Sequence, residues 1–314
     1  MPGTPAKSAS TVKVLLAFAA IYIIWGSTYY GIREALTGFP PFLLGGLRFL
    51  IAALLMFGWS LAQGVSIHPR GDLRTSLIVG FLLLFVGNGA VVWVERTIAS
   101  SAVAIVIAVA PLMFVLLDKP QWRINLRSWS VLLGVFFGFA GVLLLFSEKI
   151  AAQWNTSGVS PEFSTLLVLL LALTAWPAGS IYSKYNPTSV PATVSTGWQM
   201  LMGGACFLLV SAGRGELQDF QWAEVPLRAW LAEAYLIVFG SIIGYSAYVW
   251  LLTVRPTAQV STYAYVNPIV AVVLGVALGN EPFGWREAAG LVIILGGVLL
   301  INLAKYRVAR QERG

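Results

Sequence analysis

The sequence predicts an all-α integral membrane protein, with ten transmembrane helices arranged as two inverted five-helix repeats. Three observations lead to this prediction. Hydrophobic residues make up 58% of the 314 residues and charged residues only 11%, well below the roughly 25% of a soluble domain. Apolar runs of about 20 residues, enough for a helix to cross a bilayer, recur along the chain. The second part of the chain also repeats features of the first.

The apolar runs are continuous and lack the in–out alternation of barrel strands, so they favour helices, which satisfy their own backbone groups in lipid. No stretch remains for a soluble domain. In chain order, we expect spans at Val12–Gly31, Pro41–Leu61, Leu73–Trp93, Ala99–Leu117, Ser128–Leu145, Phe163–Tyr185, Pro191–Ser211, Ala229–Leu252, Pro256–Gly279 and Gly284–Leu303.

The positive charges indicate how the chain is oriented. The net charge is +7, but the basic residues lie in short gaps between apolar runs, so we expect no nucleic-acid partner. With the N-terminus in the cytoplasm, thirteen Lys and Arg residues fall on the cytoplasmic side and six on the other, with Arg48 inside the second span. Both termini are therefore predicted to be cytoplasmic.

A shift of 157 positions superimposes part of the chain on itself. It aligns Gly87 with Gly244, Trp93 with Trp250 and Pro111 with Pro268, while Trp25 with Trp176 matches in a different register. We assign residues 1–150 to the first five-helix repeat and residues 151–314 to the second. Because five is odd, the two repeats would face opposite ways in the membrane. Inverted repeats of this kind place a substrate site at their interface and permit alternating access.

Three motifs resemble the drug/metabolite transporter superfamily, EamA family. They are Tyr22-Ile-Ile-Trp-Gly-Ser-Thr-Tyr29, Pro40-Pro41 followed by Gly45-Gly-Leu-Arg-Phe49, and Tyr263-Ala-Tyr-Val-Asn-Pro268 followed by Gly279-Asn-Glu281. The resemblance covers nearly the whole chain. It implies ten helices, an inverted repeat, and export of amino acids or other small metabolites. The chain looks most like bacterial inner-membrane exporters, including those for aromatic amino acids.

Two matching prolines are candidates for gating. A proline inside a helix lacks an N–H and clashes with the carbonyl four residues earlier, so Pro111 and Pro268 would strain the carbonyls of Ile107 and Ala264. One interpretation is a pair of bendable helices flanking a central site. The alternative is a pair of simple kinks required for packing.

The substrate-binding candidates are polar and aromatic residues that share helix faces or occupy repeat-equivalent places. Asn267 has a second interpretation, as a cap on strained backbone, and the hydroxyl groups have one as bonds to their own helix. A weakly charged aromatic cavity would suit an amphipathic ligand with an apolar body. The candidates are Trp25, Ser27, Thr28, Asn88, Trp176, Ser180, Tyr245, Tyr248, Gln259, Tyr263 and Asn267.

Few charges lie deep in the spans. Arg48 either binds a carboxylate or extends to the interface, and we favour the second. Glu95 and Arg96 either form a gate or a local ion pair, whereas Glu233 lies near a span end and is expected to contact headgroups. Since no carboxylate is clearly central, we expect ion coupling to be weak or absent, with transport driven by the gradient of the substrate.

The leading hypothesis is an alternating-access exporter in the bacterial inner membrane that carries amino acids, in particular aromatic ones, or related metabolites. A multidrug exporter, a membrane-embedded enzyme acting on lipid-linked substrates, and a receptor are the alternatives. We expect a monomer in the lipid bilayer with a small-molecule substrate, no enzymatic activity, no cofactor and no metal. A phosphate-binding Gly-x4-Gly-Lys-Ser/Thr loop is absent from the sequence, so ATP-driven transport is not expected.

Overall fold

The computed structural model describes residues 10–68, 73–125, 127–148, 150, 161–218, 220–255 and 257–311, and these residues form helices and connecting turns without strands. The described residues of the predicted ranges are mostly helical, with turns at residues 108–109 and 261–262. In the first half the elements are α1 (Thr11–Ala19), η1 (Ala20–Ile24), α2 (Trp25–Ala35), α3 (Pro41–Ala62), α4 (Arg74–Val79), η2 (Gly80–Asn88), α5 (Gly89–Val94), α6 (Ser100–Ile107), α7 (Ala110–Leu117), η3 (Lys119–Gln121), α8 (Trp122–Asn125) and α9 (Trp129–Leu145).

In the second half the elements are α11 (Pro161–Tyr185), α12 (Ala192–Gly213), η4 (Trp222–Glu224), α13 (Leu227–Tyr235), η5 (Leu236–Tyr245), α14 (Ser246–Val254), α15 (Thr257–Val260), α16 (Tyr263–Ala277) and α17 (Trp285–Gln311). The predicted boundary between residues 150 and 151 adjoins residues 151–160, which lie outside the described residues. The orientation residues Lys7, Arg70, Lys149 and Arg313 lie outside them as well.

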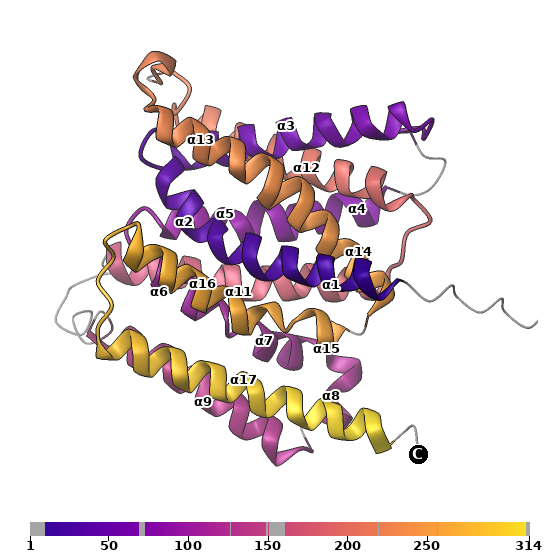
Figure 1. Ribbon diagram of the computed structural model, residues 1–314, viewed down its shortest axis with the longest axis vertical. Coiled ribbons are helices and arrows are strands. Elements are labelled where there is room, and N and C mark those ends of the chain that lie inside the picture. The colour runs from indigo at the N-terminus through magenta and orange to yellow at the C-terminus, as the bar shows by residue number, and fades with distance from the viewer. Residues whose placement is uncertain are drawn as a thin grey trace, which may run out of the picture.

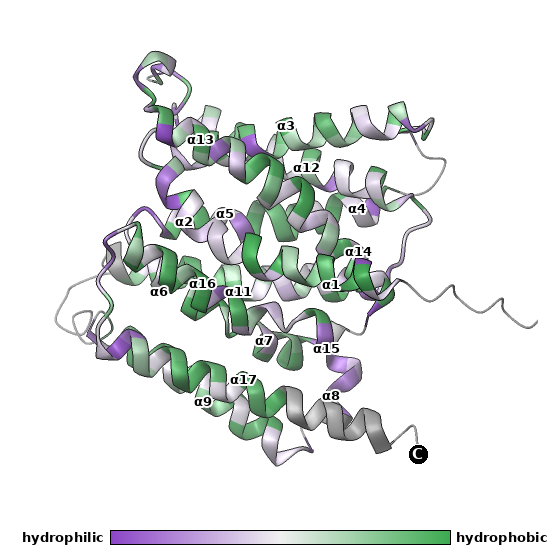
Figure 2. Ribbon diagram, viewed as in Figure 1, coloured by the Kyte–Doolittle hydropathy of each residue, from purple (hydrophilic) through white to green (hydrophobic). Residues whose placement is uncertain are grey.

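Within the described part of the chain, seven continuous helical segments are long and apolar enough to cross a membrane: residues 11–35, 41–62, 74–94, 100–117, 163–185, 192–213 and 227–254. Helices α9 and α16 are apolar but shorter. Figure 2 shows hydrophobic residues along the helices and hydrophilic ones gathered toward their ends. Large apolar side chains face outward, such as Leu54, Phe136 and Val292, which are 66%, 66% and 70% exposed. This distribution suits a surface surrounded by lipid.

The most extensive helix pairings join repeat-equivalent helices, α3 with α12 and α9 with α17 (Figure 1). In the α9–α17 pair, a Cβ atom on Gly134 would lie 2.5 Å from the carbonyl oxygen of Gly297, and one on Gly141 would lie 3.2 Å from that of Gly290. These two close approaches run in opposite directions along the two helices, which are therefore antiparallel. Small residues at such crossings let helix backbones pack tightly in lipid.

The remaining contacts occur in exchanged pairs. Helix α2 packs against α16, and α11 packs against α7. Likewise, α2 contacts α13 and η5, whereas α11 contacts η2 and α5. Each of these contacts between the halves therefore has a counterpart in which the two halves change roles. This is the arrangement that a pseudo-two-fold axis between two similar halves produces.

Three segments depart from α-helical geometry. The π-helical turns η2 and η5 occupy equivalent positions in the two halves, and η1 interrupts the first segment just before Trp25. The segment with Pro111 breaks at Ala108 and Val109, between α6 and α7, whereas Pro268 lies inside the continuous helix α16. The two prolines therefore distort their helices differently. Isolated π-turns inside helices are rare and frequently mark functional sites.

Candidate functional site

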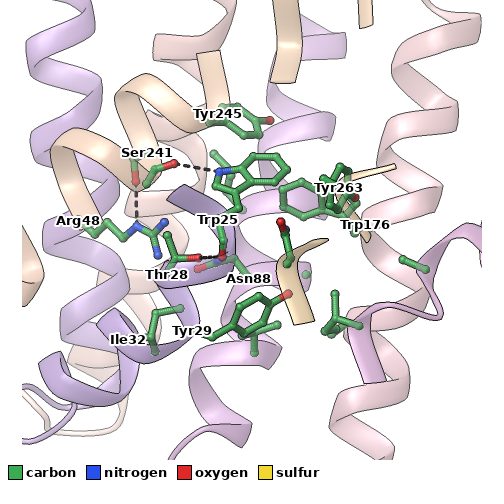
Figure 3. Close-up of a pocket in the computed structure, with 18 of the residues that line it drawn as sticks. Trp25, Thr28, Tyr29, Ile32, Arg48, Asn88, Trp176, Ser241, Tyr245 and Tyr263 are labelled. Atoms are coloured by element: carbon green, nitrogen blue, oxygen red, sulfur yellow. Dashed lines mark hydrogen bonds between the residues drawn. The ribbon is translucent and has the colours of Figure 1, made fainter. Parts of the chain in front are cut away.

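A cavity of about 90 Å³ lies where the two halves meet. It is lined from the first half by α2, α3, η2, α5, α6 and α7, and from the second half by α11, η5 and α16. Figure 3 shows the indole of Trp25 between Arg48 and Ser241 on one side and Tyr263 and Trp176 on the other. This volume holds only a few water molecules.

The cavity wall is largely aromatic. Trp25 meets Trp176 edge-on at 5.5 Å and Tyr263 at 5.3 Å, measured between ring centroids, and Trp176 lies 6.3 Å from Tyr245. Tyr248 packs behind these rings, 5.0 Å from Trp25. Trp25 and Trp176 thus occupy matching positions in the two halves and touch each other across the interface. Edge-to-face contacts of this kind hold each ring in a fixed orientation.

The turn η5 positions two of the cavity side chains. The Nε1 atom of Trp25 donates a hydrogen bond to the carbonyl oxygen of Gly240, at 3.2 Å. The Nε atom of Arg48 donates one to Oγ of Ser241, at 2.8 Å (Figure 3). A Cβ atom at Gly240 would lie 3.0 Å from Nη2 of Arg48, so the glycine leaves room for the guanidinium group.

Asn88 and Asn267 line opposite parts of the cavity. The Oδ1 atom of Asn88 is buried and has no hydrogen-bond partner among the described residues. The amide of Asn267, with its nitrogen facing η1, donates to the carbonyl oxygens of Ile21 at 3.1 Å and Tyr22 at 3.0 Å. Asn267 therefore both borders the cavity and satisfies the backbone of the π-turn that precedes Trp25. This favours the interpretation of Asn267 as a cap on strained backbone.

The structure brings seven of the predicted site residues together at the cavity: Trp25, Thr28, Asn88, Trp176, Tyr245, Tyr263 and Asn267. The other four do not line it. Ser27 donates to the carbonyl oxygen of Ile24 and shares a hydrogen bond with Tyr235, and Ser180 donates to the carbonyl oxygen of Trp176. Tyr248 forms the second layer of the wall, and Gln259 lies in α15.

The environments of four charged residues differ from the sequence-based interpretation. Arg48 does not extend to the membrane interface, because it is 3% exposed and lines the cavity. Glu233 does not reach headgroups, because it is 2% exposed within the bundle. Glu95 and Arg96 form no ion pair: Glu95 is buried, and the guanidinium of Arg96 lies 4.2 Å above the ring of Trp93. Two carboxylates, Glu95 and Glu233, are therefore buried, and weak or absent ion coupling stays a prediction.

Sequence reasoning missed several lining residues, including Tyr29, Gly240 and Ser241. Gly240 and Ser241 carry no sequence signal that separates them from ordinary small residues of a membrane helix. Arg48 carried one, since it was the only basic residue placed well inside a predicted span and away from its ends.

One ion pair joins the halves at the start of the segment Ser100–Leu117. Glu281 accepts hydrogen bonds from Arg33 at 2.9 Å and from the backbone N–H groups of Ser100 and Ser101, both at 2.9 Å. A carboxylate is favoured at these groups because they form the N-terminus of α6. Burial raises the pKa of Glu281, but the hydrogen bonds from Ser101 and Ser100 outweigh it and hold this pKa below its ordinary value.

A second ion pair joins the halves at the other end of the same segment. The Nζ atom of Lys184, from the end of α11, lies 2.9 Å from Oδ2 of Asp118, and Tyr185 donates to Oδ1 of Asp118 at 2.7 Å. The register that aligns Trp25 with Trp176 also aligns Arg33 with Lys184. Arg33 and Lys184 are thus repeat-equivalent, and each pairs with an acidic residue of the other half. The two ion pairs lie at opposite ends of the segment Ser100–Leu117.

The EamA-like transporter family matches this chain twice, over residues 12–147 and 163–303. The uncharacterized inner membrane transporter YedA of Escherichia coli (strain K12) is 36% identical over 92% of this chain and 90% of its own length. The uncharacterized transporter sll0355 of Synechocystis sp. is 25% identical over 94% of this chain and 92% of its own.

A solved structure, described only as "Crystal structure of protein", shares the fold with a TM-score of 0.67 and 21% identity, covering 96% of this chain and 99% of that one. The likeness to it concerns the fold alone. The two family matches fall on the two halves of the chain. The chain therefore belongs to the EamA-like transporter family and is a membrane transporter rather than an enzyme.

Proposed function

We propose that this transporter exports amino acids, in particular aromatic ones, or related small metabolites by alternating access. The observation that carries the proposal is the closed aromatic cavity built from both halves, with Trp25 and Trp176 in contact at its centre. A cavity with an aromatic wall and a few polar groups fits an amphipathic molecule with an apolar body.

The proposal includes the membrane topology. Ten helical segments would cross the bacterial inner membrane as two inverted repeats, with both termini in the cytoplasm. The antiparallel pairing of α9 with α17 supports the inversion, because the equivalent helices of the two halves run in opposite directions. The excess of Lys and Arg in alternate connections supports the orientation. We infer that the protein acts as a monomer, since one chain supplies the whole cavity wall.

The two ion pairs support a transport cycle. Arg33–Glu281 closes one end of the segment 100–117 and Lys184–Asp118 closes the other. Opening one ion pair while the other holds would expose the cavity to one side of the membrane at a time. The structure has both ion pairs formed, which suits an occluded intermediate of such a cycle.

Helix bending near the prolines would accompany this opening. Ile107 and Ala110 line the cavity on either side of the break that precedes Pro111. Asn267 lines it next to Pro268. Both prolines therefore lie beside residues that face the cavity, as gating elements would, although they distort their helices in different ways.

The test is transport of a panel of radiolabelled amino acids and cationic dyes by the purified protein in liposomes. Tyr263→Ala and Asn267→Ala should each lower amino-acid transport at least tenfold, because one removes part of the aromatic wall and the other releases η1. The matched control is Asn186→Ala, since Asn186 is exposed and bonds only to the carbonyl oxygen of Tyr182. Transport of dyes without any amino acid would favour the multidrug alternative. Wild-type rates in both cavity variants would contradict the assigned site.

A further inference from the structure

Arg48 is a buried cation at the edge of the cavity. Its side chain is 3% exposed, and the Nη1 atom has no hydrogen-bond partner among the described residues. Among the described residues, its side chain forms one hydrogen bond, from Nε to Oγ of Ser241. A guanidinium group has five N–H donors, so much of its hydrogen-bonding capacity is unused. An unsatisfied charge inside a membrane protein is costly and generally serves function.

No carboxylate of the described residues lies within ion-pair distance of Arg48. Its electrostatic neighbours are Glu233 and Glu95, and the oxygen atoms of both are buried without hydrogen-bond partners. Both carboxyl groups are near enough to interact electrostatically with Arg48, but neither forms an ion pair with it. A buried charge in this state is stabilised by an incoming counter-ion that brings its own hydrogen-bond acceptors.

The surroundings of Arg48 hold its guanidinium group in one orientation. Ser241 fixes Nε, and the missing Cβ of Gly240 leaves space for Nη2. The Cζ atom of Arg48 also lies 4.9 Å from the ring centre of Phe49. Figure 3 shows the group at the cavity edge, beside Thr28 and below Ser241. A planar guanidinium fixed in this way is suited to bind a carboxylate through charge-assisted hydrogen bonds.

We propose that Arg48 binds the carboxylate of the transported substrate, so that the substrates are carboxylic acids with an apolar or aromatic body. This proposal rests on the proposed function and narrows it. The aromatic wall receives the body, and the unpaired Oδ1 of Asn88 accepts a hydrogen bond from a donor on the substrate, such as the ammonium group of an amino acid. Arg48 also disfavours lipophilic cations, which the aromatic wall alone would accept.

The test compares acids with amides of the same shape. Liposomes containing the wild-type protein are assayed for uptake of L-phenylalanine against L-phenylalaninamide and of 3-phenylpropionate against 3-phenylpropionamide, each radiolabelled. We expect each acid to be preferred at least tenfold. Arg48→Gln should lower this preference to about one, because charge-assisted bonds are lost, and Arg48→Lys should retain part of it. The matched control is Arg228→Gln, since Arg228 is exposed.

Two further variants keep the arginine and disturb its position; Gly240→Ala also brings a Cβ to 3.0 Å from Cγ2 of Thr28, whereas Ser241→Ala does not add an atom. Gly240→Ala displaces the guanidinium group and Ser241→Ala removes its anchoring bond, so both should lower the acid-to-amide ratio even if Arg48→Gln does not fold. Equal transport of acids and amides by the wild type would overturn the role of Arg48 while leaving the proposed function intact. An unchanged ratio in all the folded variants would also overturn it. Absence of transport for every acid would overturn both proposals.

Discussion

At the scale of single residues, the site depends on side chains whose partners come from the other half of the chain. Trp25 is held by the carbonyl oxygen of Gly240, and Asn267 bonds to the carbonyl oxygens of Ile21 and Tyr22. Each of these contacts links one repeat to the other. The geometry of the cavity is therefore a property of the interface, and a substitution there should alter transport more than it alters folding.

Trp25 allows a graded test of the aromatic wall. Trp25→Ala removes the ring that contacts Trp176, Tyr248 and Tyr263, and we expect it to raise the substrate concentration for half-maximal transport about tenfold. Trp25→Phe keeps a ring and loses only the bond to Gly240, so its effect should be smaller. Uptake by liposomes at a series of substrate concentrations measures both. Trp129→Ala, a tryptophan that is 77% exposed, is the control. An equal effect of Trp25→Ala and Trp129→Ala would contradict the prediction.

Glu95 lies in the turn after α5, and burial, reinforced by the charge of Glu281, raises its pKa well above the ordinary value of 4.5. The folded protein therefore binds this proton more tightly than the unfolded chain does. The contribution to the free energy of unfolding is fully present below 4.5 and is lost as the pH rises through the folded-state pKa.

Glu95→Gln should remove this dependence and flatten the profile of thermal stability against pH. Thermal unfolding of the detergent-solubilised protein at a series of pH values from about 4 to about 8 measures it. Glu224→Gln, at an exposed position, serves as the control and should leave the profile as it is in the wild type. A wild-type slope that persists in Glu95→Gln would show that other groups determine it.

At the scale of elements, the helix pairs and π-turns determine which residues face the cavity. The pairs α3–α12 and α9–α17 flank the remaining helices (Figure 1). The turns η2 and η5 carry Asn88, Gly240, Ser241 and Tyr245 to the cavity wall. A π-helical segment has more residues per turn than an α-helix. The side chains that follow it therefore point in other directions than they would in a regular α-helix. A helix face that is predicted from regular α-helical periodicity therefore shifts to other residues after each π-helical segment.

The close approach of α9 and α17 predicts opposite effects for two glycine substitutions. A Cβ at Gly134 would lie 2.5 Å from the carbonyl oxygen of Gly297, so Gly134→Ala should destabilise the protein by about 1–3 kcal/mol. At Gly296, one position before Gly297, a Cβ would contact nothing within 4 Å. Gly296→Ala should therefore be neutral or stabilising by up to about 1 kcal/mol, since alanine favours helix. Thermal unfolding in detergent measures both, and equal shifts would argue against tight pairing.

At the scale of the whole molecule, two similar halves meet around one cavity, and an ion pair closes each end. Both ends have the same kind of contact, an ion pair between the two halves. The two ion pairs differ in how far their side chains are buried. The side chain of Glu281 is 0% exposed and accepts bonds from Arg33, Ser100 and Ser101, whereas that of Asp118 is 12% exposed. The basic partners are similarly exposed, at 38% for Arg33 and 41% for Lys184. An exposed ion pair contributes little to stability because water screens it. The Lys184–Asp118 end should therefore open more readily.

This inequality leads to a prediction about access to the cavity. In a Cys206→Ser background, a cysteine at a cavity position, Ile107→Cys, reports access to a membrane-impermeant thiol reagent. Asp118→Asn should raise the labelling rate from the Lys184 side by several fold, and Glu281→Gln should raise it from the Arg33 side, because each removes one charge of an ion pair. Labelling from inside and outside oriented vesicles distinguishes the sides. A rise from the same side in both variants would contradict closure at two opposite ends.

Much of the architecture follows from the sequence. A helix rises about 1.5 Å per residue, so an apolar run of suitable length is by itself enough to predict a helical membrane segment. The constant offset between Gly, Trp and Pro positions likewise predicted two related halves. The motifs around Trp25 and Tyr263 indicated the family and most of the aromatic wall.

Only the tertiary structure decided which polar groups face the cavity and how its ends are closed. Arg48, Glu95 and Glu233 are buried because helices from both halves surround them, and hydropathy along one segment carries no information about its neighbours. Ser241 and Gly240 reach the cavity through a π-turn, which changes the side-chain direction without a distinctive residue pattern. Length and hydropathy are local properties of the chain, whereas the partner of a buried charge lies more than a hundred residues away, in the other half.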